Sequence, residues 1–185
     1  MFNIIRPLIF KFSPEVAHSL AIKALKLNNI SYSKPIDNHI LETTFCEKKL
    51  SSPIGVAAGF DKNAEVYNPL FNLGFGFVEV GTITPKPQFG NPKPRVFRLE
   101  EDEALINRLG FNNSGSEQIS QTIKENNKKG FLGINIGPNK DSKDRIEDYL
   151  ICFRKFYNLA DYITINISSP TVSYTHLRAH ETSID

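Results

Sequence analysis

The chain has 185 residues, 40% of them hydrophobic, which is enough to bury a core and makes one domain the default expectation. Its formal net charge of +2 is too small to indicate a nucleic-acid-binding protein. The two cysteines, Cys46 and Cys152, lie far apart without metal-ligand spacing, which favours reduced thiols over a metal site.

The first forty residues predict a pair of short apolar helices. Residues 2–12 are mostly apolar, and Ser13 followed by Pro14 is typical of a helix start. Bases outnumber acids here, so the pair could lie in a membrane interface, although no apolar run reaches the roughly 20 residues of a membrane span. Ordinary packing on the domain surface would explain the same pattern. His18 lies in the second helix, where a lone histidine more often packs than binds a ligand.

The rest of the chain alternates apolar segments that end in polar residues with segments of helical periodicity. Residues 43–50 precede a turn at Pro53. The predicted strands then cover residues 54–58, 77–81, 132–137 and 162–170, and the predicted helices cover residues 64–73, 115–129 and 145–158. This order predicts an α/β fold of the (β/α) barrel type, in which ligands bind at the carboxyl ends of the strands. A closed barrel has eight strands and typically about 250 residues, so the chain has room for about half of one.

Three features at these strand ends suggest a ligand. Residues 55–63, Gly-Val-Ala-Ala-Gly-Phe-Asp-Lys-Asn, place small residues and then Lys62 after the first strand, which lets a flat ligand approach the backbone beside a cation. A plain strand-to-helix turn is the alternative. Residues 86–113 form a long loop whose asparagines suit a heterocycle with carbonyl and N–H edges, unless they only close turns. Asn135, in an apolar strand, is either hydrogen-bonded in the core or aimed at a ligand.

Five motifs follow one another along the chain: Gly55-Val-Ala-Ala-Gly-Phe-Asp-Lys-Asn63, Val80-Gly-Thr-Ile-Thr-Pro85, Asn107-Arg-Leu-Gly-Phe-Asn-Asn113, Gly133-Ile-Asn-Ile-Gly137 and Asn166-Ile-Ser-Ser-Pro170. Together and in this order they resemble the quinone-dependent class of dihydroorotate dehydrogenases. The resemblance implies the N-terminal half of a (β/α)8 barrel that carries FMN, preceded by the helical pair. It also makes the membrane interpretation of that pair the preferred one.

The resemblance assigns roles to individual residues. The residues implied to bind FMN are Ala58, Gly59, Phe60, Asp61, Lys62, Thr82, Asn135 and Asn166. Those implied to bind the substrate are Lys62, Asn107, Arg108, Leu109, Gly110, Phe111 and Asn166. Ser169 would be the general base that removes the C5 proton of dihydroorotate while hydride leaves C6. The soluble classes use a cysteine at this position, so the serine favours the quinone class.

The same resemblance implies partners and a location. Reduced flavin would pass electrons to a quinone held between the N-terminal helices, with His18 near the quinone channel. The enzyme would make orotate for pyrimidine synthesis while bound peripherally to the cytoplasmic side of the inner membrane. We therefore expect a membrane-associated region over residues 1–40 and a partial FMN-binding barrel over residues 41–170.

After Pro170 the sequence departs from the family. Thr171 stands where a substrate-contacting asparagine is expected, and residues 174–182 look like translated sequencing adapter. His176 and His180 have helical spacing, but we expect no metal there. We hypothesise a truncated reading frame with an unrelated, disordered or artefactual tail over residues 171–185. Such a fragment would bind FMN poorly and catalyse nothing.

The sequence also allows two other interpretations of its function. One is a phosphate-binding barrel lyase or isomerase, which shares the architecture and would be favoured if borohydride trapped a Schiff base at Lys62. The other is a non-enzymatic, membrane-peripheral fragment.

Overall fold

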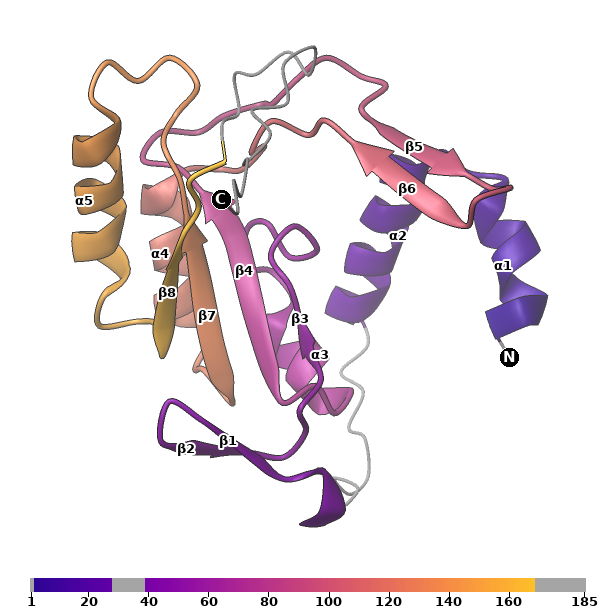
Figure 1. Ribbon diagram of the computed structural model, residues 1–185, viewed down its shortest axis with the longest axis horizontal. Helices are drawn as coiled ribbons and strands as arrows, with labels where there is room; N and C mark the ends of the chain where they lie inside the picture. The colour runs from indigo at the N-terminus through magenta and orange to yellow at the C-terminus, as the bar shows by residue number, and fades with distance from the viewer. Residues whose placement is uncertain (1, 28–38, 169–185) are drawn as a thin grey trace, which may run out of the picture.

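The computed structural model describes residues 2–27 and 39–168 (Figure 1). The helical pair is confirmed as α1 (Phe2–Phe10) and α2 (Pro14–Leu27). The remaining helices are the 3-10 turn η1 (His39–Leu41), α3 (Tyr67–Asn72), α4 (Ser116–Glu125) and α5 (Arg145–Phe156). The strands are β1 (Thr43–Phe45), β2 (Lys48–Leu50), β3 (Gly55–Val56), β4 (Phe77–Ile83), β5 (Val96–Leu99), β6 (Ala104–Asn107), β7 (Phe131–Ile136) and β8 (Tyr162–Ile165).

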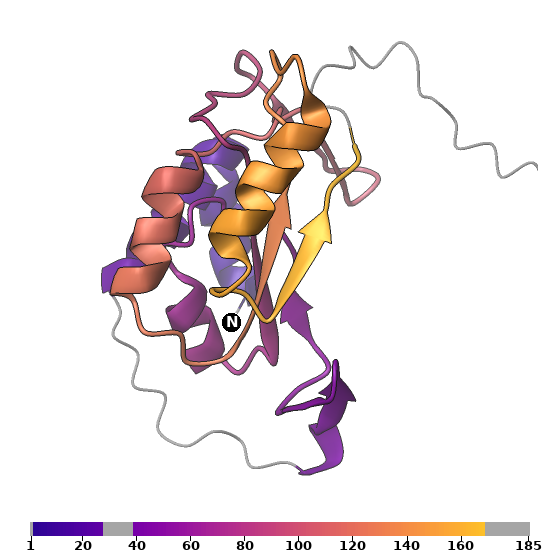
Figure 2. The same cartoon turned by 90° about the vertical axis from the view of Figure 1, so that its left-hand side faces the viewer.

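A parallel sheet of four strands, in the order β3-β4-β7-β8, is the centre of the fold. Side chains alternate along β4, so Val78 and Val80 are fully buried while Glu79 on the opposite face is partly exposed. The buried face packs against helices, with Ile119 of α4 and Phe156 of α5 in the same core cluster. Figure 2 shows α4 and α5 together on one side of the sheet. The predicted parallel α/β arrangement is confirmed, and the four strands do not close a barrel within the described part of the chain.

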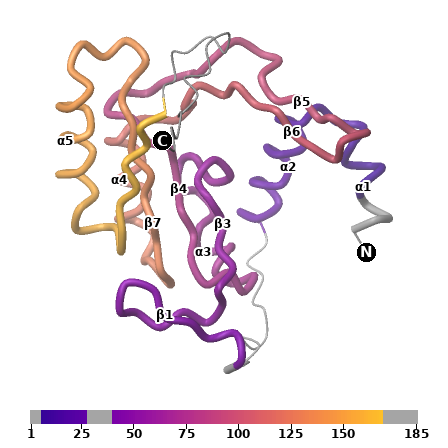
Figure 3. Tube along the Cα trace, viewed as in Figure 1, coloured from indigo at the N-terminus to yellow at the C-terminus, as the bar shows by residue number. Residues whose placement is uncertain are grey.

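Two hairpins were not predicted as such. Residues 43–50 fold back on themselves as β1 and β2, because the backbone reverses at Cys46 and Glu47, which both adopt positive φ. The predicted loop over residues 86–113 contains the antiparallel hairpin β5–β6. Its strands lie beside the helical pair rather than in the central sheet (Figure 3), so their apolar residues do not show the pattern of a barrel strand.

The β1–β2 hairpin covers the end of the sheet where the strands begin. The Phe45 ring packs 5.7 Å from the ring centroids of both Phe131 and Tyr162, each in an edge-on arrangement. Lys48 of β2 forms an ion pair with Asp161, immediately before β8. The amino end of the sheet is thereby filled by an aromatic cluster, which leaves the carboxyl end as the place for a ligand.

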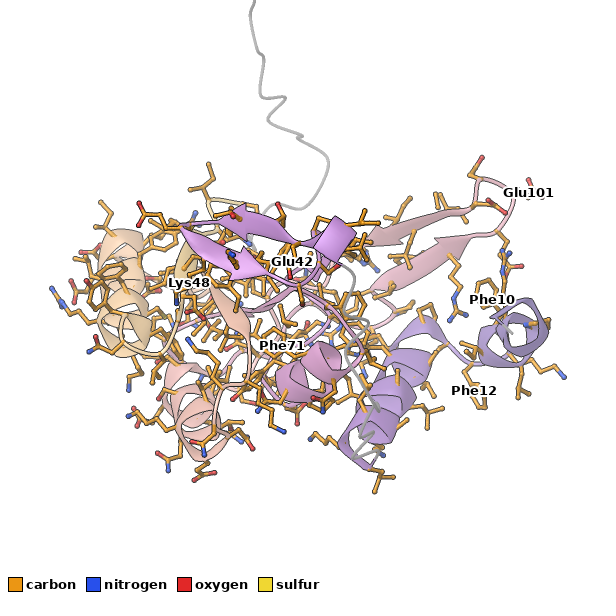
Figure 4. All side chains as sticks on the ribbon, turned by 90° about the horizontal axis from the view of Figure 1, so that it is seen from below. Phe10, Phe12, Glu42, Lys48, Phe71 and Glu101 are labelled. Atoms are coloured by element: carbon orange, nitrogen blue, oxygen red, sulfur yellow. The ribbon has the colours of Figure 1, made fainter. Side chains whose placement is uncertain are left out.

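Two arginines of the β5 region attach the helical pair to the barrel. The Arg95 side chain is almost fully buried, and its guanidinium donates to the Glu15 carboxylate of α2 from Nε at 3.0 Å and from Nη2 at 2.9 Å. Arg98 donates to the carbonyl of Phe12 at 2.8 Å and lies 4.5 Å from the Phe10 ring centroid. Figure 4 shows α1 and α2 at the same end of the molecule as the hairpin tip that carries Glu101. These contacts fix α2 over the strand ends.

We expect Arg95→Met to lower the free energy of unfolding by about 2–4 kcal/mol, because it leaves the partly buried Glu15 carboxylate without its cation and the carbonyl of Phe89 without its donor. Arg154→Met removes an exposed guanidinium whose pairing with Glu147 is open to water, so it should change stability by under about 0.5 kcal/mol. Urea unfolding of both variants measures the difference. Equal losses would show that Arg95 is not a structural anchor.

Candidate functional site

The carboxyl ends of the four parallel strands surround a cavity of about 440 Å³. Ten of the residues predicted to bind FMN or substrate line it: Ala58, Gly59, Lys62, Thr82, Asn107, Leu109, Gly110, Phe111, Asn135 and Asn166. The remaining lining residues are Ala57, Glu79, Gly81, Asn112 and Ser168. Segments up to about a hundred residues apart in the sequence thus meet at one place, as parallel strands require.

A second, larger cavity of about 1050 Å³ lies between α2 and the strand ends. Val16, His18 and Ile22 of α2 line one side of it, and Phe60 and Arg95 lie among the residues of the other. Six residues line both cavities and form a shared wall: Ala58, Gly59, Lys62, Asn107, Leu109 and Asn112. A group held at this wall would be reachable from two separate compartments.

Lys62 is the cation of the shared wall. Its Nζ donates to the carbonyl of Gly59 at 2.5 Å, and burial together with the nearby Arg95 lowers the pKa of the amine. Gly59 has φ +104°, and a Cβ built there would meet no atom within 4 Å, so the backbone faces open space. Its N–H donates to the carbonyl of Gly81 at 2.8 Å, which ties the end of β3 to that of β4.

Three predicted site residues point elsewhere. The Asp61 carboxylate is buried and accepts hydrogen bonds from the backbone N–H groups of Glu65 and Val66, each at 2.8 Å, so it holds the turn that carries Lys62. Burial raises the pKa of Asp61. Phe60 lines only the larger cavity. The Arg108 guanidinium donates to the carbonyl of Pro94 at 3.0 Å and lines neither cavity.

A chain of hydrogen bonds crosses the strand ends. The Thr82 hydroxyl donates to Asn135 Oδ1 at 2.7 Å, and Asn166 Nδ2 donates to Thr82 Oγ1 at 2.9 Å. Asn166 Oδ1 accepts from the hydroxyl of Ser168 at 2.6 Å. Ser169, the predicted general base, lies outside the described residues, as does the tail that follows it. The three predicted polar residues at the strand ends, Thr82, Asn135 and Asn166, are therefore joined by direct hydrogen bonds.

Glu79 was not predicted from the sequence, whereas Asn112 was expected as one of the loop asparagines that suit a heterocycle. Glu79 lines the smaller cavity and accepts a hydrogen bond from Asn135 Nδ2 at 2.9 Å. The sequence feature that could have indicated Glu79 is a carboxylate within the otherwise apolar strand 77–81, on the face opposite Val78. Asn112 belongs to the shared wall, and its Oδ1 is the one buried side-chain polar atom without a hydrogen-bond partner in residues 2–27 and 39–168. A buried acceptor without a partner is what a bound donor would satisfy.

His18 connects α2 to the strand end. Its Nε2 lies 2.7 Å from the carbonyl oxygen of Phe60, and the two rings meet edge-on with centroids 5.4 Å apart. Burial and the neighbouring Lys62 lower the pKa of His18, which favours the neutral ring. The histidine thus closes the larger cavity against the turn that carries Lys62.

The part of the chain that the structure describes holds neither a metal-binding cluster nor a membrane-spanning helix. No group of three or more His, Cys, Asp and Glu side chains there is arranged to hold a metal ion. No helix in that part of the chain has both the length and the apolar character needed to cross a bilayer.

Comparison with known proteins gives one family. The family model described as dihydroorotate dehydrogenase matches residues 40–184. A dihydroorotate dehydrogenase (quinone) of Bartonella henselae is 53% identical over 165 residues, which are 89% of this chain and 45% of the relative. One of Rhizobium etli is 51% identical over 174 residues, or 94% of this chain and 48% of the relative. The chain spans about half the length of the curated relatives it matches.

Solved structures that resemble this chain come from the same family. A dihydroorotate dehydrogenase of Eimeria tenella, crystallised with ferulenol, superposes with a TM-score of 0.79 at 40% identity, covering 88% of this chain and 46% of that one. The ligand-free form of the same enzyme gives the same TM-score over 86% of this chain. The predicted fold, about half of a (β/α) barrel behind a helical pair, is confirmed.

We expect His18 to make stability depend on pH. Because its pKa is lowered from the ordinary value of 6.5 on folding, the unfolded chain binds more protons at this residue than the folded chain. The stabilisation is complete above pH 6.5 and is lost as the pH falls through the folded-state value. Between about pH 8 and about pH 5 the melting temperature should therefore fall more steeply for the wild-type chain than for His18→Gln, whose side chain at residue 18 cannot titrate. Parallel curves would contradict this.

Proposed function

The chain belongs to the dihydroorotate dehydrogenase family, and we propose that it forms the N-terminal part of a quinone-dependent member. The proposed reaction is the oxidation of dihydroorotate to orotate in pyrimidine synthesis, with FMN as hydride acceptor and a quinone as final acceptor. The shared wall between the two cavities supports this most directly. Dihydroorotate and the quinone would occupy different cavities, so a redox group at the wall, the flavin, is needed to carry electrons from one to the other. The activity is proposed for a protein that includes this segment.

The residues of the smaller cavity fit a flavin. Lys62, Asn135 and Asn166 provide N–H donors for the carbonyl edge of its ring, and Gly59 leaves the backbone open to a flat face. FMN supplies the two-electron chemistry when bound, since no side chain of the site can accept a hydride. A cation at Lys62 would stabilise the negative charge that develops on reduction.

Residues 107–111 would close on the substrate. This segment lines the smaller cavity through Asn107, Leu109, Gly110 and Phe111, while Arg108 holds it by its bond to Pro94. Lys62 would also neutralise the carboxylate of dihydroorotate. We propose Ser169 as the general base that takes the C5 proton. Its neighbour Ser168 lines the same cavity, and a hydroxyl base needs such a positioned, water-poor place.

The larger cavity would hold the quinone. Val16 and Ile22 give it an apolar side, and His18 stands where α2 meets the turn that carries Lys62. Exposed apolar side chains of the helical pair, Leu8, Phe12, Val16 and Leu20, would dip into a membrane from which a quinone could enter. We propose a peripheral position on the cytoplasmic side of the inner membrane.

Titration with FMN tests the flavin proposal. Because the chain spans about half the length of its relatives, we expect weak but saturable quenching of flavin fluorescence by the purified chain. Lys62→Met should raise the Kd about tenfold further because a partly buried cation is lost. Lys124→Met, which removes an exposed lysine from α4, is the matched control and should leave the Kd unchanged. Wild-type chain that quenches no flavin, or equal affinities of all three proteins, would contradict flavin binding at this site.

Vesicle co-sedimentation tests the membrane proposal. The double variant Leu8→Glu/Leu20→Glu places charges on side chains that are 60% and 46% exposed, so binding should fall by at least about threefold. Ile146→Glu, at a 72% exposed position on α5, is the control and should bind like the wild type. A double variant that sediments as the wild type does would argue against contact through these helices.

A further inference from the structure

Glu79 is a carboxylate in the site to which the proposed reaction gives no role. The strand register aligns it with Gly133 of β7 and, one strand further, with Tyr162 of β8. A Cβ at residue 133 would lie 2.1 Å from the Tyr162 ring, so only glycine lets that ring cross β7. The Tyr162 hydroxyl reaches Glu79 Oε2 at 3.0 Å because of this gap.

Three donors from two neighbouring strands converge on Glu79. Besides Tyr162, the Thr164 hydroxyl donates to Oε2 at 2.9 Å, and Asn135 Nδ2 donates to Oε1 at 2.9 Å. Burial and the adjacent carboxylate raise the pKa of Tyr162, so the phenol keeps its proton and remains a donor. An ionised carboxylate can only accept hydrogen bonds, and this arrangement meets that requirement at both oxygens.

The carboxylate fixes the direction of the hydrogen-bond chain beyond it. Asn135 directs its NH2 group at Glu79, so its Oδ1 faces Thr82. The Thr82 hydroxyl has one hydrogen, and it donates that hydrogen to Asn135 Oδ1 in a hydrogen bond. Thr82 is left with lone pairs and accepts from the NH2 of Asn166. The Oδ1 of Asn166 faces Ser168, from whose N–H and hydroxyl it accepts at 3.0 and 2.6 Å. Starting from Glu79, each group therefore has one orientation that pairs every donor with an acceptor, and the Ser168 N–H, which can only donate, supports the same orientation at the Asn166 end.

We propose that Glu79 is a positioning residue that sets the polarity of the Asn135–Thr82–Asn166 chain, so that the cavity offers a ligand amide N–H donors rather than carbonyl acceptors. Both amide oxygens are engaged by protein donors, whereas each NH2 group has one N–H without a protein partner in residues 2–27 and 39–168. Together with Lys62 these donors select a heterocycle edged with carbonyl oxygens. Only the identity of that ligand, FMN, rests on the proposed function.

Spectra of the ligand-free chain labelled with 15N-asparagine test the polarity directly. In Glu79→Gln the carboxamide can donate or accept, so the orientation of the chain is no longer imposed from the Glu79 end, and only the Ser168 N–H at the other end still holds it. We expect the side-chain amide signals of both Asn135 and Asn166 to shift or split, although Asn166 makes no bond to Glu79. Glu117→Gln, at an exposed carboxylate of α4 that pairs with Lys155 far from the cavity residues, should move neither. An unchanged Asn166 amide in Glu79→Gln would overturn the proposal.

A charge exchange separates positioning from simple structural support. Asn135→Asp sets two carboxylates against each other, so we expect the melting temperature to fall by roughly 5–10 °C, or the chain to fail to fold. Adding Glu79→Gln restores one donor and one acceptor at that contact, so the double variant should recover most of the loss. A double variant no more stable than Asn135→Asp would overturn the direct coupling of Glu79 to Asn135.

Flavin affinity completes the test. Glu79→Gln and the double variant should both bind FMN about tenfold more weakly than the wild type, since residue 135 no longer presents a fixed N–H. Wild-type affinity in the stably folded double variant would overturn the role of these donors. If the wild-type chain itself does not bind FMN, the flavin proposal fails, while the amide spectra and the melting temperatures still decide whether Glu79 sets the polarity.

Discussion

The parallel register of β3, β4, β7 and β8 is the constraint on which the site depends. Backbone hydrogen bonds continue past the regular strands: Gly81 N–H donates to the carbonyl of Asp61 at 3.1 Å, Gly137 N–H to that of Ile83 at 2.9 Å, and Asn166 N–H to that of Ile136 at 2.9 Å. Each bond holds the irregular end of one strand to its neighbour. Polar side chains that would otherwise sit on mobile loops are thereby held on a rigid edge, which is what a preorganised site requires.

The second compartment exists because α2 is held at a distance from this edge. Arg95 is buried between the two, bonded to Glu15 on one side and to the carbonyl of Phe89 at 2.6 Å on the other. It also lowers the pKa of Lys62, after the larger effect of burial. One guanidinium therefore both spaces the helical pair and influences the cation of the shared wall, so the shape of the larger cavity and the electrostatics of the smaller one are coupled.

The sequence predicted the elements that have a clear period and missed those that do not. The strand 132–137 and the helix 145–158 were found to within two residues, because a continuous apolar run and an amphipathic stripe are local signals. The β5–β6 hairpin was missed, since its strands pack beside α2, a partner that no local pattern reveals. The cavity residues came from the motifs, but the directions of their side chains depend on long-range hydrogen bonds such as that of Arg108 to Pro94.

Two acidic residues show why motif position does not give a role. Asp61 lies inside the motif expected to line the flavin, yet its carboxylate accepts hydrogen bonds from two backbone N–H groups and lines neither cavity. Glu79 was given no role by any motif, yet it lines the cavity and receives three side-chain donors. The difference lies in what faces each oxygen. Backbone donors leave a carboxylate no freedom to orient other groups, whereas amides and hydroxyls must turn to meet it, and their orientation passes from strand to strand across the site.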